Sequence, residues 1–439
     1  MSDTPPKHNI LQLGILLFLI VHWLIPWEAP LMGSGGGWLR AGLYMVLISL
    51  SLMRNSGHEH YPLLKYLLLL LIINYTIVTL SPLLWGGGLV FRMYYIWEPL
   101  FIVLLATICQ TPKEIQKCFY FCIGAILFSV LWGALMMQVG GSFTSIRNAI
   151  IGIGETTEEY GELREGHEYR IVGFSKSIFS LGYLIATAGA AVVIQFFRTS
   201  GWYKRIFYFG CILLLFWGII GNAQRSSIVG IGGGVLLWFI AMKRFHVQYF
   251  FLGLLIAIIV LALIKNDIIT AQGDERRGNL LMRLQRIEQA EEDTLRYHRQ
   301  KQALFAILTS WTQPPEENYA YRCQMKLGDR VLLAPHNHFL TNSMRGVAPV
   351  LFLELIIMFI IGRIVWIGHQ MWKRIGDKEN SEWHWIIASC LFASILCGMF
   401  HNTGLFNAEP ATVIMLGLLC ASYVCGIRIL SSNDCQKND

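Results

Sequence analysis

The side chains best suited to chemistry lie in one cationic segment, from Arg296 to Arg345. It contains RYHRQKQALFAIL, a polar run and then APHNHFLTNSMRG. Basic residues and histidines far outnumber carboxylates there, with Arg296, His298, Arg299, Lys301, Arg322, Lys326, Arg330, His336, His338 and Arg345 against Glu316, Glu317 and Asp329. Apolar runs long enough to cross a membrane flank the segment on both sides. Because such a cluster of cations is costly to build without an anion, we interpret the segment as a site for a lipid-linked diphosphate.

Two histidines of this segment, His336 and His338, are candidates for proton transfer. A neutral imidazole can accept a proton from an attacking hydroxyl near pH 7. With Asn337 between them, the rings lie on different faces if HNH begins a helix and on the same face if it is extended. HNH lacks the spacing of HExxH, and no carboxylate triad accompanies it, which argues against a zinc site. A purely structural role, with the ring bonded to a loop carbonyl, is the alternative.

Four arginines are candidates for holding phosphate groups. Arg170 opens RIVGFSKSIFSLGYL, Arg225 lies in GNAQRSSIVG, and Arg296 and Arg299 lie in the cationic segment. The planar guanidinium makes bidentate, charge-assisted hydrogen bonds and stays protonated, which suits a diphosphate. Alternatively, each of these arginines could be an interfacial anchor, whose guanidinium reaches toward the phosphates of membrane lipids.

Further polar residues lie near the outward ends of apolar runs. His401 is in FHNTGLFN, and three carboxylates, Glu28, Glu98 and Glu409, lie at similar positions. One of these carboxylates could act as a base or orient a histidine, although a structural role is the more ordinary explanation for each of them.

Membrane helices must position these residues. The chain has 439 residues, of which 54% are hydrophobic and 14% charged, the composition of an integral membrane protein. The net charge of +7 does not indicate nucleic-acid binding, because the basic residues lie at loop ends. We expect one all-α polytopic membrane domain over residues 1–439. About twelve transmembrane helices are predicted, at 10–26, 38–53, 63–80, 92–109, 117–138, 172–197, 203–221, 226–242, 247–265, 346–368, 384–401 and 408–429.

Basic residues outside the two long loops gather on the side of the N-terminus, which the positive-inside rule assigns to the cytoplasm. Both termini are therefore expected there, and the loops 139–171 and 266–345 are expected to face outward. Apolar residues between Leu280 and Ile307 recur at helical spacing, which predicts one or two amphipathic helices along the membrane surface. The proline pair that begins at Pro314 ends them.

The sequence resembles the O-antigen ligase and polymerase family. RIVGFSKSIFSLGYL, with Arg170, is similar to the family's Arg-x-x-Gly-Phe segment before a span, and NAQRSS is similar to its Ser-Arg motif, with Gln224 at the preceding position. RYHRQKQALFAIL resembles its arginine-led amphipathic helix, with Arg296 leading. HNHFLTNSMRGVAP resembles its His-Asn-x-x-Leu signature, which places the essential histidine on His336, with His338 as the competing register. PPEENYAYRC replaces the family's Gly-x-Gly element.

The resemblance implies a GT-C-like glycosyltransferase in the bacterial inner membrane that transfers O-antigen from undecaprenyl diphosphate to lipid A-core on the periplasmic face. It implies His338 or His336 as the catalytic residue, Asn337 in support and Arg170, Arg225, Arg296 and Arg299 on the diphosphate. Direct attack by the acceptor hydroxyl would invert the anomeric centre. Because a diphosphate already leaves readily, arginines can replace a metal, and we expect no metal and no other cofactor.

Three alternatives remain open. An O-antigen repeat-unit polymerase shares the donor but uses a second lipid-linked glycan as acceptor, and a protein O-oligosaccharyltransferase is the third enzyme of this kind. A transporter or flippase would explain the spans without catalysis. Transporters usually carry ionisable residues or broken helices at mid-membrane, whereas the charges here cluster at the outer surface.

Overall fold

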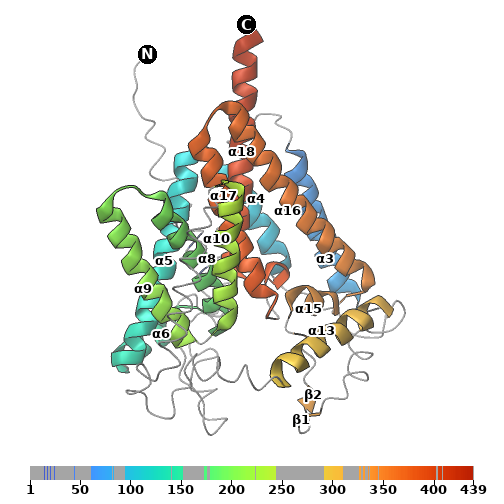
Figure 1. Ribbon diagram of the computed structural model, residues 1–439. Coiled ribbons are helices and arrows are strands. Elements are labelled where there is room, and N and C mark those ends of the chain that lie inside the picture. Colours follow the sequence, from blue (N-terminus) through green and yellow to red (C-terminus); the bar gives the residue numbers. More distant parts are fainter. Residues whose placement is uncertain are drawn as a thin grey trace.

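The computed structural model describes residues 61–81, 83, 94–139, 141–151, 173–175, 178–222, 224–243, 291–309, 326–327, 330–331, 335, 337–344, 346–401, 404–407 and 409–438, with isolated positions before residue 50. These residues form a helical bundle (Figure 1). Its long helices are α3 (Pro62–Leu80), α4 (Tyr94–Ile108), α5 (Pro112–Val139), α8 (Ile178–Arg198), α9 (Trp202–Asn222), α10 (Arg225–Ala241), α16 (Ala348–Ile375), α17 (Lys378–Gly398) and α18 (Pro410–Asn438).

Shorter elements lie at one end of the bundle, the lower end in Figure 1. They are α6 (Gly141–Ile151), α13 (Glu291–Thr309), α15 (His338–Met344) and the 3₁₀ turn η5 (Leu405–Asn407). Two short strands, β1 (Lys326–Leu327) and β2 (Arg330–Val331), pair antiparallel. We call this end of the bundle the site end, because it carries the candidate residues described below.

Six of the described helices are long and apolar enough to cross a membrane: Pro62–Leu80, Pro112–Met136, Ser180–Arg198, Trp202–Asn222, Ala348–Ile375 and Pro410–Ser432. Each coincides with a predicted span, and two shorter apolar helices, Tyr95–Ile108 and Ser226–Ala241, occupy two further ones. By length and composition the helices fit a multi-pass membrane protein. The predicted spans 10–26, 38–53 and 247–265 lie almost entirely outside the described residues, so the count of twelve stays a prediction.

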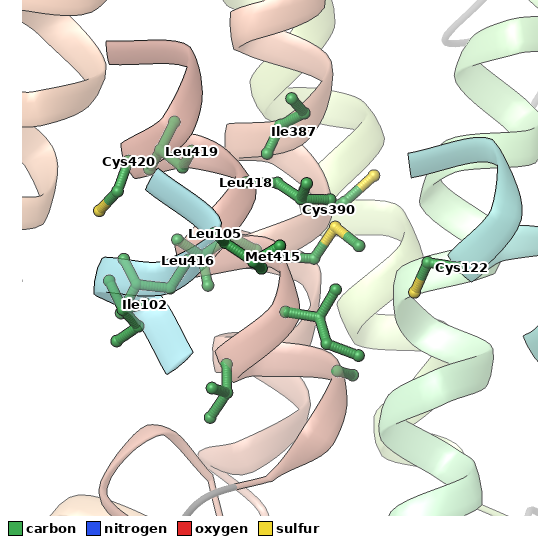
Figure 2. Packing of buried hydrophobic residues seen from close by; sticks show 14 of the residues in the cluster. Ile102, Leu105, Cys122, Ile387, Cys390, Met415, Leu416, Leu418, Leu419 and Cys420 are labelled. Carbon is green, nitrogen blue, oxygen red and sulfur yellow. The ribbon is translucent and has the colours of Figure 1, made fainter. Parts of the chain in front are cut away.

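The centre of the bundle is formed by α8 and α18. Within the membrane-length windows, 83% of the α8 residues and 78% of the α18 residues are buried, against 28% in α16. Figure 2 shows the packing around α18, where Met415 and Leu416 lie close to Leu105 of α4, and Ile387 and Cys390 of α17 belong to the same buried cluster. Peripheral helices instead expose large apolar side chains, such as Phe207 and Phe359, as expected where lipid surrounds the protein.

Close contact between α10 and α17 depends on glycine. A Cβ atom on Gly230 would lie 2.5 Å from the carbonyl oxygen of Ala393, and one on Gly234 would lie 2.6 Å from that of Ser389. Small residues at such positions let helix backbones approach closely in membranes. This contact brings the beginning of α10, which carries Arg225, beside the end of α17 and His401.

Candidate functional site

The helix α15 begins at His338, in the helical arrangement that was one of the two possibilities for HNH. Asn337 is its N-cap, since its Oδ1 accepts hydrogen bonds from the backbone N–H groups of Phe339 at 3.1 Å and Leu340 at 3.3 Å. The side chain predicted to support a catalytic histidine therefore fixes the helix end that carries His338. His336 lies outside the described residues.

The imidazole of His338 is fully buried. Its ring centroid lies 3.9 Å from that of Phe339 and 6.2 Å from that of Phe406 in η5. Gly404 closes a further side, because a Cβ there would lie only 2.6 Å from Cγ of His338. Among the described residues, neither ring nitrogen has a hydrogen-bond partner of normal geometry. The ring is thus held mainly by packing.

Burial controls the charge of His338. It lowers the pKa of the imidazole from 6.5 to about 4, and the nearby backbone carbonyl of Gly398 opposes this shift to a smaller extent. The ring is therefore neutral at pH 7, with a lone pair that can accept a proton.

Acid should destabilise the protein through this residue. Between pH 6.5 and about 4 the unfolded chain binds a proton at His338 that the folded protein does not, so stability falls as the pH falls through that window. Complete protonation would cost about 3 kcal/mol. Thermal unfolding in detergent should therefore depend less on pH across this window in His338→Phe than in the unchanged protein. Identical pH dependence in the two proteins would contradict the assignment.

The other end of α15 is anchored to α16 through a buried carboxyl group. Asn342 Nδ2 donates to Glu354 Oε1 at 2.5 Å, and Ser343 Oγ donates to Glu354 Oε2 at 3.1 Å. All three side chains are fully buried. Glu354 was missed in the sequence, although a carboxylate within the apolar run LFLELIIMFII signals a role by itself. It fixes the direction of the helix that carries His338.

A second histidine lies over the first turn of α10. His401 Nε2 and Ser226 Oγ are 2.6 Å apart, and Cys397 Sγ donates to the same serine at 3.5 Å. Ser227 Oγ donates to the backbone carbonyl of Gly182 at 2.9 Å and so ties α10 to α8. His401 thus contacts the residue that directly follows Arg225. The backbone of Arg225 begins α10, but its side chain is not among the described parts of the structure.

Glu409 connects these elements. Its Oε1 accepts a hydrogen bond from Ser180 Oγ of α8 at 2.7 Å, and its backbone N–H donates to the carbonyl of Gly404 at 3.2 Å. Gly404 is the residue against which the His338 ring packs. The backbone of Glu409 therefore holds the turn against which the His338 ring packs, and its buried carboxylate ties that turn to α8.

The arginine-bearing helix α13 packs against α15. Ala303, Ala306 and Ile307 form a small apolar core with Leu340 and Met344 of α15. A helix is confirmed over Glu291–Thr309 of the predicted amphipathic stretch, and its position along a membrane surface stays a prediction. Residues 280–290 lie outside the described residues.

Arg299 lies one turn before Ala303, on the face of α13 that meets α15. Its side chain is partly buried, and its buried Nε has no hydrogen-bond partner among the described residues. Arg296 precedes Arg299 by three residues in the same helix, although its side chain is not described. The helix that carries both arginines therefore lies directly beside the helix that begins at His338.

Sequence inspection missed one buried arginine in the first loop. Arg147 of α6 is fully buried and donates from Nε to the carbonyl of Gly173 at 3.1 Å and from Nη2 to that of Ser175 at 3.1 Å. Gly173 has φ of +56°, and a Cβ there would lie 2.3 Å from the Ser129 carbonyl oxygen. Arg147 thus fixes the backbone of the segment that Arg170 opens. Arg170 itself lies outside the described residues.

The described part of the chain therefore gathers His338, His401 and Glu409 at one end of a helical membrane bundle, with the backbone of Arg225 and the helix of Arg299 beside them. That arrangement places a buried, neutral imidazole beside the helix that carries Arg299. Comparison with models of known protein families finds no match, and no curated protein matches the chain.

Proposed function

We propose that the protein is an O-antigen ligase, which transfers O-antigen polysaccharide from undecaprenyl diphosphate to lipid A-core on the periplasmic face of the inner membrane. One observation carries the proposal: the buried, neutral His338 lies beside the helix of Arg296 and Arg299, at the end of the bundle where Arg225 begins α10. The order of the motifs around Arg170, Arg225, Arg296 and His338 supports it.

The reaction follows from these groups. A hydroxyl oxygen of the acceptor sugar attacks the anomeric carbon of the donor, and the bond from that carbon to the diphosphate oxygen breaks. The electron pair leaves with the diphosphate, whose growing charge is stabilised by Arg170, Arg225, Arg296 and Arg299. The hydroxyl proton passes to His338, or to His336 in the alternative register. Direct attack inverts the anomeric centre.

The low pKa of His338 is compatible with this role. A neutral ring accepts a hydrogen bond from the acceptor hydroxyl, and bound diphosphate raises the pKa of the imidazole, because a nearby negative charge favours its protonated form. The base therefore becomes stronger when the donor is present. Because arginines would supply the positive charge that a metal gives elsewhere, transfer by the purified protein should continue in the presence of a chelator, and loss of transfer would contradict the metal-free account.

Arg225 gives a separate prediction. Arg225→Gln should lower kcat/KM for the lipid-linked donor by about 10²-fold, as removal of one donor to a developing anion does elsewhere. Arg225→Lys should be intermediate, because it keeps the charge but loses the bidentate fork. Arg205→Gln, which changes an exposed arginine of α9 that donates to the Thr199 carbonyl, is the matched control. If Arg225→Gln and the control behaved alike, Arg225 would not bind the donor.

A deletion strain tests the proposed function against the polymerase. Loss of a ligase leaves long O-antigen chains on the carrier lipid and the lipid A-core without them. Loss of a polymerase leaves lipid A-core that carries a single repeat unit. Analysis of the lipopolysaccharide and of the carrier-linked pool in one strain separates the two, and capped core would overturn the ligase assignment.

A further inference from the structure

An apolar groove of about 530 Å³ lies between α3 and α4. Apolar side chains form most of its walls: Leu68, Ile72, Leu80, Ile96, Leu100 and Val103. Two tyrosines, Tyr75 and Tyr95, also line it, but their rings stack with centroids 4.6 Å apart, and the Tyr75 hydroxyl donates to Glu98 at 2.6 Å. The groove therefore presents almost entirely hydrocarbon surface.

The groove runs along α3 toward the site end. On α3 it reaches from Leu68 to Leu80, which at 1.5 Å per residue is about 18 Å, more than half of a hydrocarbon core of about 30 Å. Near the Leu80 end, on a face of α3 outside the groove, Val78 lies beside Gly346, since a Cβ on Gly346 would be 3.5 Å from Val78 Cγ2. Gly346 separates α15 from α16. The Leu80 end of the groove thus lies at the level of the bundle where the helix that carries His338 meets α16.

The groove walls favour a hydrocarbon chain over a polar ligand. Besides the two tyrosines, the polar residues of the lining are Thr76 and Thr79, and the Thr76 hydroxyl already donates to the Ile72 carbonyl at 2.8 Å. The walls therefore offer few free hydrogen-bonding groups to a polar ligand.

We propose that this groove binds the polyprenyl chain of the lipid-linked donor, with its diphosphate at the Leu80 end beside α15. The inference rests on the proposed function, because it takes the diphosphate donor from there. Burying a chain that already lies in lipid gives no hydrophobic gain. Recognition must therefore come from close packing against the groove walls, which discriminates by shape.

Photolabelling tests the proposal. The probe is undecaprenyl diphosphate with a diazirine in one of the isoprene units near the diphosphate, added to the purified protein in nanodiscs. The labelled peptides should come from α3 and α4. Ile72→Trp, which fills the groove from an exposed position, should reduce labelling about five- to tenfold, since it removes the close contacts. The control is Phe359→Trp, on the lipid-facing surface of α16 and 66% exposed, and it should leave labelling unchanged.

Kinetics give a second readout. For the long-chain donor, Ile72→Trp should raise KM about fivefold and leave kcat unchanged, because only contacts with the chain are lost. Turnover of a donor with a single isoprene unit should be unaffected, because this donor does not reach Ile72. Labels spread over other lipid-facing helices would overturn the proposal. A second probe, a photoreactive phosphatidylethanolamine, tests for a phospholipid site. If it labelled the groove equally and excess undecaprenyl diphosphate did not displace it, the groove would be a phospholipid site and the proposal would be overturned.

The experiment separates this inference from the proposed function, because labelling requires no turnover. Labelling of α3 and α4 without any glycan transfer would support the groove and contradict the ligase assignment. Transfer with labelling elsewhere would contradict the groove and leave the ligase assignment intact.

Discussion

Replacing His338 by alanine should lower the rate of glycan transfer by about 10²- to 10⁴-fold, the contribution of a positioned proton acceptor. The ring is fully buried against Phe406 and Gly404, so a water or a flexible neighbour cannot easily take its place. The loss should appear mainly in kcat, because His338 acts on the acceptor proton. The measurement is single-turnover transfer by purified protein whose folding is checked by thermal unfolding in detergent.

Two further variants make this result specific. His369→Ala changes a partly buried histidine of α16 that contacts Ser381 at 2.7 Å, and it should keep full activity. Gly404→Ala keeps His338 but forces its ring to move, since the new Cβ would lie 2.6 Å from Cγ, and it should also impair transfer. Full activity in His338→Ala and in His336→Ala would show that neither histidine accepts the proton.

Arg147→Met should destabilise the fold by about 2–6 kcal/mol. Methionine fills similar space but leaves the carbonyls of Gly173 and Ser175 without the buried donors that now reach them at 3.1 Å. Each unsatisfied buried acceptor costs about 1–3 kcal/mol. The same change should raise KM for the donor, because the backbone that leads from Arg170 loses its support.

Arg205→Met is the control for that experiment, since Arg205 bonds the Thr199 carbonyl from an exposed position and should change stability by less than about 0.5 kcal/mol. Arg147→Lys should be intermediate, because an ammonium group cannot reach both carbonyls in the planar geometry of a guanidinium. Thermal unfolding of the three variants in detergent measures the effect. Equal unfolding temperatures for Arg147→Met and the control would contradict the role of the buried guanidinium.

The sequence predicted those features that depend on local pattern. The apolar runs marked the described spans, and the spacing of Ala303 and Ile307 indicated α13. His401 and Glu409 were noted because they lie near span ends. In each case the relevant information lies within a few residues of the chain.

Features that depend on which helices become neighbours could not be predicted in this way. The contact of His401 with Ser226 joins positions separated by 175 residues, and that of Ser180 with Glu409 joins positions separated by 229. Gly404 matters only because the His338 ring packs against it. Arg147 lies within the predicted loop 139–171, and its burial depends on the path of the chain at Gly173.

Transfer in proteoliposomes tests the central claim most directly. Purified protein would receive a labelled glycan on undecaprenyl diphosphate together with lipid A-core, in the presence of a chelator, and the lipid products would be separated. We expect the label to move to lipid A-core with inverted anomeric configuration, and His338→Ala to form almost none of this product. No transfer by the unchanged protein, or equal transfer by the His338→Ala protein, would contradict the account.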